Sequence, residues 1–210
     1  QATPGGSLTL SPDAPPAPSR LLELTGYPDP GPMASGDWFT AWRIDWLFLA
    51  VAALAVGLYL AGVVRLRRRG DAWPVLRTVC WVLGWALFVW ATCGAPGIWG
   101  RVLFSVHMVQ HILLSMVAPV LMAVGAPITL LLRNLGGAGR RRVMAVLHSW
   151  PVRVLTWAPL GAALMIANPY LLYMTGLYEL SLSNEWVHNW VHVHFVMTGC
   201  LYFWPLLGVD

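Results

Sequence analysis

The sequence contains no lysine, and only 10% of its 210 residues are charged. Soluble domains carry about 25% charged residues, so a protein whose whole surface faces water is excluded. The thirteen basic residues are all arginines, and most lie between long apolar segments. The net charge of +4 therefore indicates membrane topology, and we predict no nucleic-acid partner.

Sequence motifs for common enzymatic chemistry are also missing. No Walker, GxSxG, HExxH or CxxC motif occurs, and no two carboxylates lie within one apolar segment. The three cysteines, Cys80, Cys93 and Cys200, lie in or at the ends of apolar segments and form no motif. Ordinary packing is the simplest role for such cysteines. We therefore predict that the chain is not an enzyme.

Apolar residues, by contrast, are abundant: 58% of the chain is hydrophobic, and the mean hydropathy is +0.63. A helix needs about 20 apolar residues to cross about 30 Å of hydrocarbon. The sequence therefore predicts an all-α, polytopic transmembrane helical bundle of about five spans, covered by lipid. Residues 1–37, rich in proline, glycine and serine, predict an irregular lead, and residues 38–210 the transmembrane domain. The predicted spans are residues 44–64, 75–92, 102–122, 154–173 and 187–207.

Two local features modify this pattern. Gly125-Ala126-Pro127 ends the third span, and the following segment, ITLLLR, is too short to cross a membrane. We expect this segment to form a short interfacial or re-entrant piece. In the first span, Ala53, Gly57 and Ala61 recur every four residues, which predicts that another helix approaches closely there.

The arginines also predict how the bundle is oriented. Ten of the thirteen lie in two clusters, at residues 65–77 and 133–153. The positive-inside rule places both clusters in the cytoplasm. The N-terminal lead and the turns at residues 93–101 and 174–186 are then extracytoplasmic.

Four histidines lie in the outer halves of two predicted spans. His107 and His111 belong to the third span, and His188 and His192 to the fifth. Each pair is spaced i, i+4, so its two imidazoles share one helix face. Ionisable residues inside membrane spans are rare and usually functional. Because both pairs lie toward the same side of the membrane, we predict that they belong to one binding site.

The residue types near these histidines favour copper over zinc. Imidazole binds copper, zinc, iron and nickel, whereas thioether and thiolate sulfur select Cu(I). Met108 lies beside His111 on the helix surface, and Cys93 lies at the outer end of the second span. Asp45, at the outer end of the first span, could orient a ligand imidazole. We therefore predict a Cu(I) site with the four histidines as favoured ligands and Met108, Asp45 and Cys93 as weaker candidates.

Other interpretations stay open at this stage. The histidines could be packing residues that hydrogen-bond between helices, and the methionines core filler. A single haem held by histidines is another alternative, whereas His107 and His111, about 6 Å apart along the helix, are too close for two stacked haems. A copper transporter would need a polar path through the cytoplasmic half, where the third and fifth spans carry no charge or histidine. His194 lies on a different face of the fifth span.

The two histidine motifs and their surroundings resemble a known family. The third span and its continuation read FSVHMVQHILLSMVAPVLMAVGAPITLLLR, and the chain closes on HNWVHVHFVMTGCLYFWPLLG. Further runs are W-x-x-D at Trp42 to Asp45, LYLAGVVRLRRRGDAWP, and NPYLLY from Asn168. Together these runs are similar to the CtaG-type assembly factors of caa-type cytochrome c oxidase, from about Leu21 to the end of the chain.

This resemblance implies a bacterial plasma-membrane protein that helps to deliver copper to cytochrome c oxidase at the outer face. Its partners would be oxidase subunits, the lipid bilayer and an extracytoplasmic copper donor; a scaffold that only clamps oxidase subunits is the alternative. The four histidines fit the family's histidines, and Asp45 its acidic position. In actinobacterial relatives this domain often follows a copper-resistance-type membrane domain. We therefore expect the chain to be the C-terminal part of such a fusion.

Overall fold

The computed structural model describes residues 30–208, and the regular elements in that range are all helical. The predicted all-α fold is confirmed for these residues, whereas residues 1–29 of the predicted lead lie outside them. In chain order the helices are α2 (Asp37–Thr40), α3 (Trp46–Arg68), α4 (Val75–Cys93), α5 (Ala95–Trp99), α6 (Phe104–Ile112), the π-helical turn η1 (Leu113–Val117), α7 (Ala118–Val124), α8 (Pro127–Asn134), α9 (Gly137–Leu147), α10 (Trp150–Leu155), α11 (Ala158–Met174), α12 (Leu177–Ser183) and α13 (Glu185–Leu207).

Several of these helices are suited to crossing a membrane. The apolar helix α11 has 17 residues, which is at the lower limit for a span. With the four longer stretches, it corresponds to the five predicted spans, so the chain is a multi-pass helical membrane protein. Within the described residues, the four stretches long and apolar enough to span are Trp46–Arg68, Val75–Trp99, Phe104–Asn134 and Trp186–Leu207.

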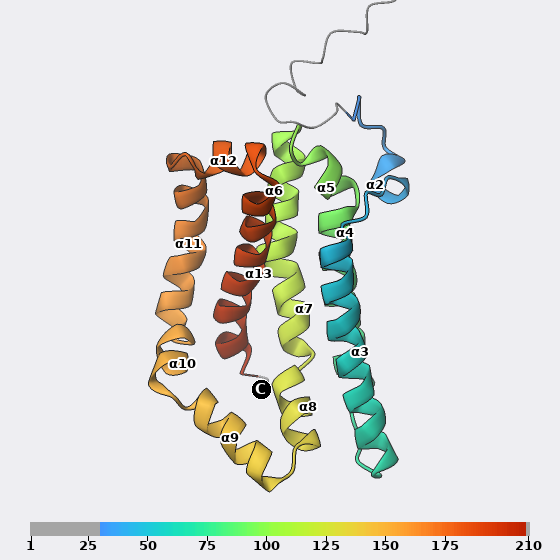
Figure 1. The fold of residues 1–210 in the computed structure, drawn as a ribbon, viewed down its shortest axis with the longest axis vertical. Coiled ribbons are helices and arrows are strands. Elements are labelled where there is room, and N and C mark those ends of the chain that lie inside the picture. Colours follow the sequence, from blue (N-terminus) through green and yellow to red (C-terminus); the bar gives the residue numbers. More distant parts are fainter. Residues whose placement is uncertain (1–29, 209–210) are drawn as a thin grey trace, which may run out of the picture.

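The spans follow a simple packing order (Figure 1). α3 packs against α4, α4 against α7, α7 against α13, and α13 against α11. The third span, formed by α6, η1, α7 and α8, therefore contacts both the second span and the last. As a result, the two helices that carry the histidine pairs are direct neighbours.

The third span departs from regular helical geometry just after its histidines. The π-helical turn η1 begins two residues after His111, and Pro119 stands in the first turn of α7. Proline has no N–H to donate, so the carbonyl of the residue four before it, Ser115, loses its usual α-helical partner. A π-helical turn accommodates this defect, and such turns occur frequently at functional sites.

Gly199 of α13 lies directly against this turn. A Cβ built at Gly199 would overlap the Ser115 carbonyl oxygen and stand 2.6 Å from Cγ of Pro119. A side chain at this position would therefore push α13 away from the third span. Because Gly199 has no side chain, α13 and the third span approach closely at a point within two helical turns of His111 and His192.

The third span is also interrupted between α7 and α8. Ala126 has a φ of 49°, in the left-handed region, which confirms the predicted break. Beyond it, α8 continues in the direction of α7 and packs against α3 (Figure 1). There Leu130 is buried, and the Asn134 side chain donates to the Gly62 carbonyl at 3.2 Å. The re-entrant alternative is thus wrong, because neighbouring helices let a membrane helix continue past glycine and proline.

The stripe of small residues on α3 faces outward. Ala53, Gly57 and Ala61 are exposed, and a Cβ built at Gly57 would meet no atom within 4 Å. The prediction of a close helix contact along this stripe is therefore wrong for the described part of the chain. The helix instead packs through larger side chains, with Phe48, Ala52, Tyr59, Val63 and Leu66 buried.

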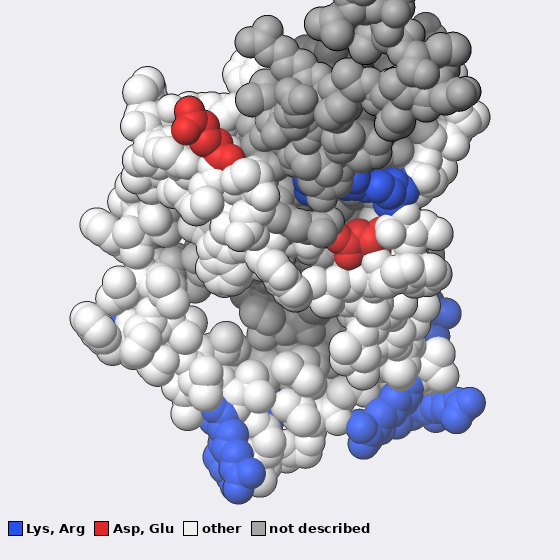
Figure 2. Space-filling view, turned by 45° about the horizontal axis from the view of Figure 1, so that its top comes forward, with Lys and Arg blue, Asp and Glu red and all other residues white. Residues whose placement is uncertain are grey.

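The two arginine clusters lie at one end of the bundle. Nη1 of Arg133 donates to the Ala72 carbonyl at 3.2 Å, which joins the loop after α3 to the end of α8. The guanidinium groups of Arg77 and Arg133 stand 5.3 and 5.7 Å from the ring centroid of Trp73. In Figure 2, basic side chains project from the lower end of the molecule. This shared location is what the positive-inside orientation requires, and the orientation itself stays a prediction.

Candidate metal centre

The four predicted histidines lie inside the bundle, at the end opposite the arginine clusters. The ring centroids of His107 and His111 on α6 are 4.1 Å apart, and those of His188 and His192 on α13 are 4.4 Å apart. None of the four side chains is more than 5% exposed. The i, i+4 spacing therefore places each pair on one face, as predicted.

The two pairs come together where α13 packs on the third span. The ring centroid of His111 is 4.2 Å from that of Phe195 on α13. His111 interacts electrostatically with His192, and His107 with both α13 histidines. Among the described residues, however, no three His, Cys, Asp or Glu side chains form a finished ligand set. The imidazoles are neighbours, and metal binding by them stays a prediction.

Most ring nitrogens in this cluster have no hydrogen-bond partner. Both nitrogens of His107, both of His192 and Nε2 of His111 are buried without one. The Gly100 backbone interacts with His107 only outside ordinary hydrogen-bond geometry. A buried polar group without a partner costs about 1–3 kcal/mol, and such groups are rare in native proteins. Their concentration in one cluster indicates that these imidazoles bind something.

His188 differs because an arginine occupies one of its nitrogens. Nε of Arg101 donates to Nε2 of His188 at 3.3 Å, and Arg101 is only 7% exposed. Because the guanidinium only donates hydrogen bonds, this contact requires a neutral imidazole as acceptor. The sequence contains no motif that identifies Arg101 as a site residue. Its one sequence signal is its place in a turn that is predicted to be extracytoplasmic, outside both arginine clusters.

Two tyrosines border the cluster on the side of α11 and α12. The ring centroids of Tyr173 and Tyr178 lie 6.2 and 5.5 Å from that of His107. The Tyr173 hydroxyl is buried without a hydrogen-bond partner. Burial raises the pKa of Tyr178 above its ordinary value of 10.0, so the phenol keeps its proton at neutral pH. Sequence reasoning missed both residues, because tyrosine near a span end is typical of the interfacial aromatic belt.

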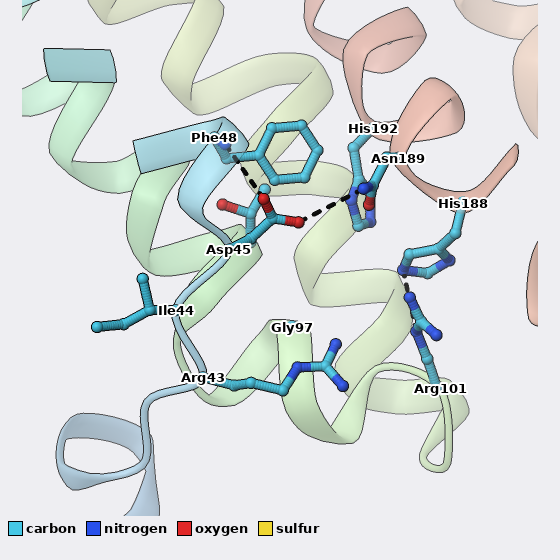
Figure 3. A pocket seen from close by; sticks show the side chains of 10 residues that line it. Arg43, Ile44, Asp45, Phe48, Gly97, Arg101, His188, Asn189 and His192 are labelled. Carbon is cyan, nitrogen blue, oxygen red and sulfur yellow. Dashed lines mark hydrogen bonds between the residues drawn. The ribbon is translucent and has the colours of Figure 1, made fainter. Parts of the chain in front are cut away.

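Asp45 lies near the α13 histidines but bonds to other groups. Its Oδ1 accepts from the backbone N–H groups of Leu47 at 2.9 Å and Phe48 at 3.3 Å, which caps α3. Its Oδ2 accepts from Nδ2 of Asn189 at 3.4 Å (Figure 3). The predicted direct orientation of an imidazole by Asp45 is therefore not the arrangement found among these contacts. Its link to α13 runs through Asn189, the neighbour of His188.

A polar cavity of about 180 Å³ opens between these residues (Figure 3). Its walls come from the segment before α3, the segment before α6, and the first turns of α13. Two of the four histidines, His188 and His192, line it at the predicted outer end. Its polar lining includes Arg43, Asp45, Arg101, His188, Asn189 and His192.

Cys93 contacts the start of α3 rather than the histidine cluster. Its thiol is 1% exposed and accepts from the backbone N–H of Asp45 at 3.4 Å. Its sulfur lies 3.7 Å from the Thr92 hydroxyl. These contacts tie the end of α4 to the start of α3, and they favour the packing role over the ligand role.

The two remaining candidate ligands, Met108 and His194, lie in different surroundings. Met108 is half-buried and lines a second cavity together with His111. His194 lies elsewhere, with its Nε2 2.9 Å from Oδ1 of Asn168. Asn168 in turn donates to the Thr198 hydroxyl at 2.8 Å. This network joins α13 to α11, so His194 has a structural partner of its own.

Fold and site together define a multi-pass membrane protein with buried imidazoles at the end opposite its arginines. Residues 57–210 match the family described as cytochrome c oxidase caa3 assembly factor (Caa3_CtaG). The match covers most of the chain, and the chain belongs to this family. The resemblance seen in the sequence is thus confirmed. The matched range contains all four histidines, whereas Asp45 precedes it.

Similar proteins occur in mycobacteria. Uncharacterized proteins of Mycobacterium leprae (strain TN), Mycobacterium bovis and Mycobacterium tuberculosis are each 36% identical to the chain over 193 residues. The aligned region covers 88% of this chain but 29% of each relative, so the chain spans under a third of their length. No solved structure gives a significant match.

Proposed function

We propose that the chain is a non-enzymatic copper-binding assembly factor that helps to deliver copper to cytochrome c oxidase. Copper is the cargo, and His107, His111, His188 and His192 would hold it as Cu(I). The observation that carries this proposal is the set of five buried ring nitrogens without a hydrogen-bond partner. Copper bound to neutral imidazole nitrogens would satisfy such groups.

An unfinished ligand set suits a factor that must release its cargo. No three candidate side chains among the described residues are already arranged as a metal site, so the four histidines would hold the ion in an open set of ligands. An open coordination position lets a ligand from a partner enter before the old one leaves. Copper would therefore pass on by ligand exchange, with no change in oxidation state and no proton transfer.

The position of the arginines supports the direction of delivery. The positive-inside rule puts the arginine-rich end in the cytoplasm and the histidines toward the outer face. The polar cavity beside His188 and His192 would admit copper from an extracytoplasmic donor. An oxidase subunit in the same bacterial plasma membrane would receive it.

Haem binding and copper transport have less support. The polar cavity beside His188 and His192, at about 180 Å³, is smaller than the roughly 300–1,000 Å³ of cofactor pockets. A larger cavity of about 450 Å³ is lined by only one of the four histidines, His111. A transporter would need polar groups leading to the cytoplasmic side. The buried residues of α7, on that side of the cluster, are Ala118, Pro119, Met122 and Ala123, which are all apolar.

Metal analysis of the purified chain tests the proposal. We expect the wild-type chain, purified in detergent from copper-supplied cells, to retain copper. The double variant His107→Ala/His111→Ala should retain at least about tenfold less, since it loses half of the ligand set. His148→Ala is the matched control, because His148 is exposed at the arginine-rich end.

The outcomes separate the candidate functions. Copper content unchanged in the double variant would overturn the proposed site. A Soret absorption band without copper would indicate the haem protein instead. Oxidase subunits that co-purify equally well with the double variant, with no copper in any sample, would indicate a scaffold.

A further inference from the structure

Three of the eight methionines gather around one cavity beside the histidine cluster. The cavity has a volume of about 450 Å³ and lies between the third span, α11 and α13. Met108 and Met116 come from the third span, and Met165 from α11. Most of the other lining residues are apolar, so the thioether sulfurs are prominent among its donor atoms.

His111 connects this cavity to the histidine cluster. It lines the cavity, is 5% exposed, and its Nε2 has no hydrogen-bond partner. The Ser115 hydroxyl, also in the lining, already donates to the His111 carbonyl at 2.6 Å. One imidazole thus belongs both to the cluster of four histidines and to the cavity wall.

We propose that this methionine cavity, formed by Met108, Met116 and Met165 with His111, is a second Cu(I) site. The inference rests on the proposed copper-delivery function and adds the place to which the ion moves from the histidines. In the transfer, a bond from copper to an imidazole nitrogen breaks and bonds to thioether sulfurs form. All of these ligands are neutral, so the ion remains Cu(I) and no proton is released.

The lining selects for a soft, singly charged ion. Thioether sulfur favours Cu(I), whereas hard cations require oxygen ligands and zinc prefers thiolate, imidazole or carboxylate. No carboxylate and no thiol lines the cavity. A divalent ion there would keep its full charge in an apolar environment, at a large cost in solvation free energy.

The cavity also lies toward the lipid-facing surface of the bundle. Ile112 and Met116 in its lining are 53% and 43% exposed. An ion held there would be within reach of a partner's membrane helices, on a different side of the cluster from the polar cavity beside His188. Copper could therefore enter from the outer water phase and leave sideways within the membrane.

Methionine can also serve as ordinary packing, and the test separates the two roles. Leucine fills similar volume without sulfur, and such swaps usually cost under about 1.5 kcal/mol each. The test variant is Met108→Leu/Met116→Leu/Met165→Leu. The matched control is Met144→Leu/Met174→Leu/Met197→Leu, since these three methionines are 36%, 79% and 52% exposed and lie outside the cavity.

The measurement is X-ray absorption at the copper edge, on full chains loaded anaerobically with Cu(I) in detergent. We expect nitrogen and sulfur neighbours of copper in the wild type and the control. The test variant should keep the nitrogen neighbours, lose the sulfur neighbours and bind less Cu(I) per chain.

Nitrogen-only coordination in the wild type, or sulfur neighbours that persist in the test variant, would overturn the methionine site and leave the histidine site intact. A wild-type chain that binds no Cu(I) would overturn both. Loss of sulfur neighbours in the control as well would show that the donors lie outside the cavity, and would also overturn the methionine site.

Discussion

Two histidines in different surroundings, His192 and His194, lie only two residues apart on α13. His194 has a partner in Asn168, at 2.9 Å, and belongs to a network that joins two helices. His192 is 2% exposed, and neither of its ring nitrogens has a partner. The hydrogen bond of His194 is what a structural packing role requires. The unpartnered nitrogens of His192 carry a cost in folding free energy that packing alone does not explain.

This difference predicts opposite effects of the same substitution. In metal-free protein, His192→Leu should leave the melting temperature unchanged or raise it, because no hydrogen bond is lost and a buried polar group is removed. His194→Leu should lower the stability by about 0.5–2 kcal/mol, because it leaves Asn168 with an unpaired carbonyl oxygen. Thermal unfolding of both variants in detergent provides the measurement. A large loss for His192→Leu would mean that its imidazole has a structural partner.

The histidine pairs could be predicted at the residue scale, and their neighbours could not. Spacing along the sequence is enough to place His107 with His111 on one face. Arg101 bonds to His188 on α13, and Tyr173 of α11 lies beside His107, so both contacts join residues far apart in the sequence. Only the packing of α13 and α11 brings these residues together. Asp45 shows the converse, because it lines one cavity with His188 and His192 while its hydrogen bonds go to other groups.

At the scale of single helices, the positions of the spans could be predicted and their irregularities could not. Hydropathy locates a span because the hydrocarbon thickness fixes its length. Hydropathy does not reveal that a π-helical turn accommodates Pro119. It also does not reveal that the helix breaks at Ala126 and then continues in the same direction. Both outcomes depend on which neighbours satisfy the freed backbone groups.

The contact between Gly199 and the π-helical turn predicts a sensitive position. Gly199→Ala should lower the free energy of unfolding by about 1–3 kcal/mol, because its methyl group has no room against Ser115. It should also lower copper retention, since α13 and α6 would move apart. Gly57→Ala is the matched control, because nothing lies within 4 Å of its added methyl group.

Melting temperatures of the two alanine variants, measured side by side, check this prediction. The control should be neutral or slightly stabilising, by up to about 1 kcal/mol, because alanine favours the helix over glycine. Equal melting temperatures for both variants would show that α13 does not need the close approach.

For the whole molecule, the orientation of the bundle decides whether the histidine cluster meets copper outside the cell. Cysteines introduced singly at Gly176, between α11 and α12, and at Gly136, between α8 and α9, have room for a side chain. A membrane-impermeant maleimide should label Gly176→Cys in intact cells, and Gly136→Cys only after permeabilisation. The parent chain gives the background from its own cysteines, which are buried or half-buried. Labelling in the reverse order would place the cluster at the cytoplasmic face.

The π-helical turn has one further consequence, for how this protein tolerates insertions and deletions. A regular helix advances about 100° per residue, so an added or removed residue rotates everything before it relative to everything after it, unless the helix widens locally into a π-helical turn. In the third span, α6 presents histidines to α13, while α7 packs Met122 against Gly84 of α4. A π-helical turn takes up about one residue more than an α-helical turn, so deleting a single residue from η1 would restore a regular helix and leave His107 and His111 facing their partners. A second deletion, or an insertion, would rotate both histidines by about 100° away from those partners. Along this segment the chain can therefore lose one residue, but not two.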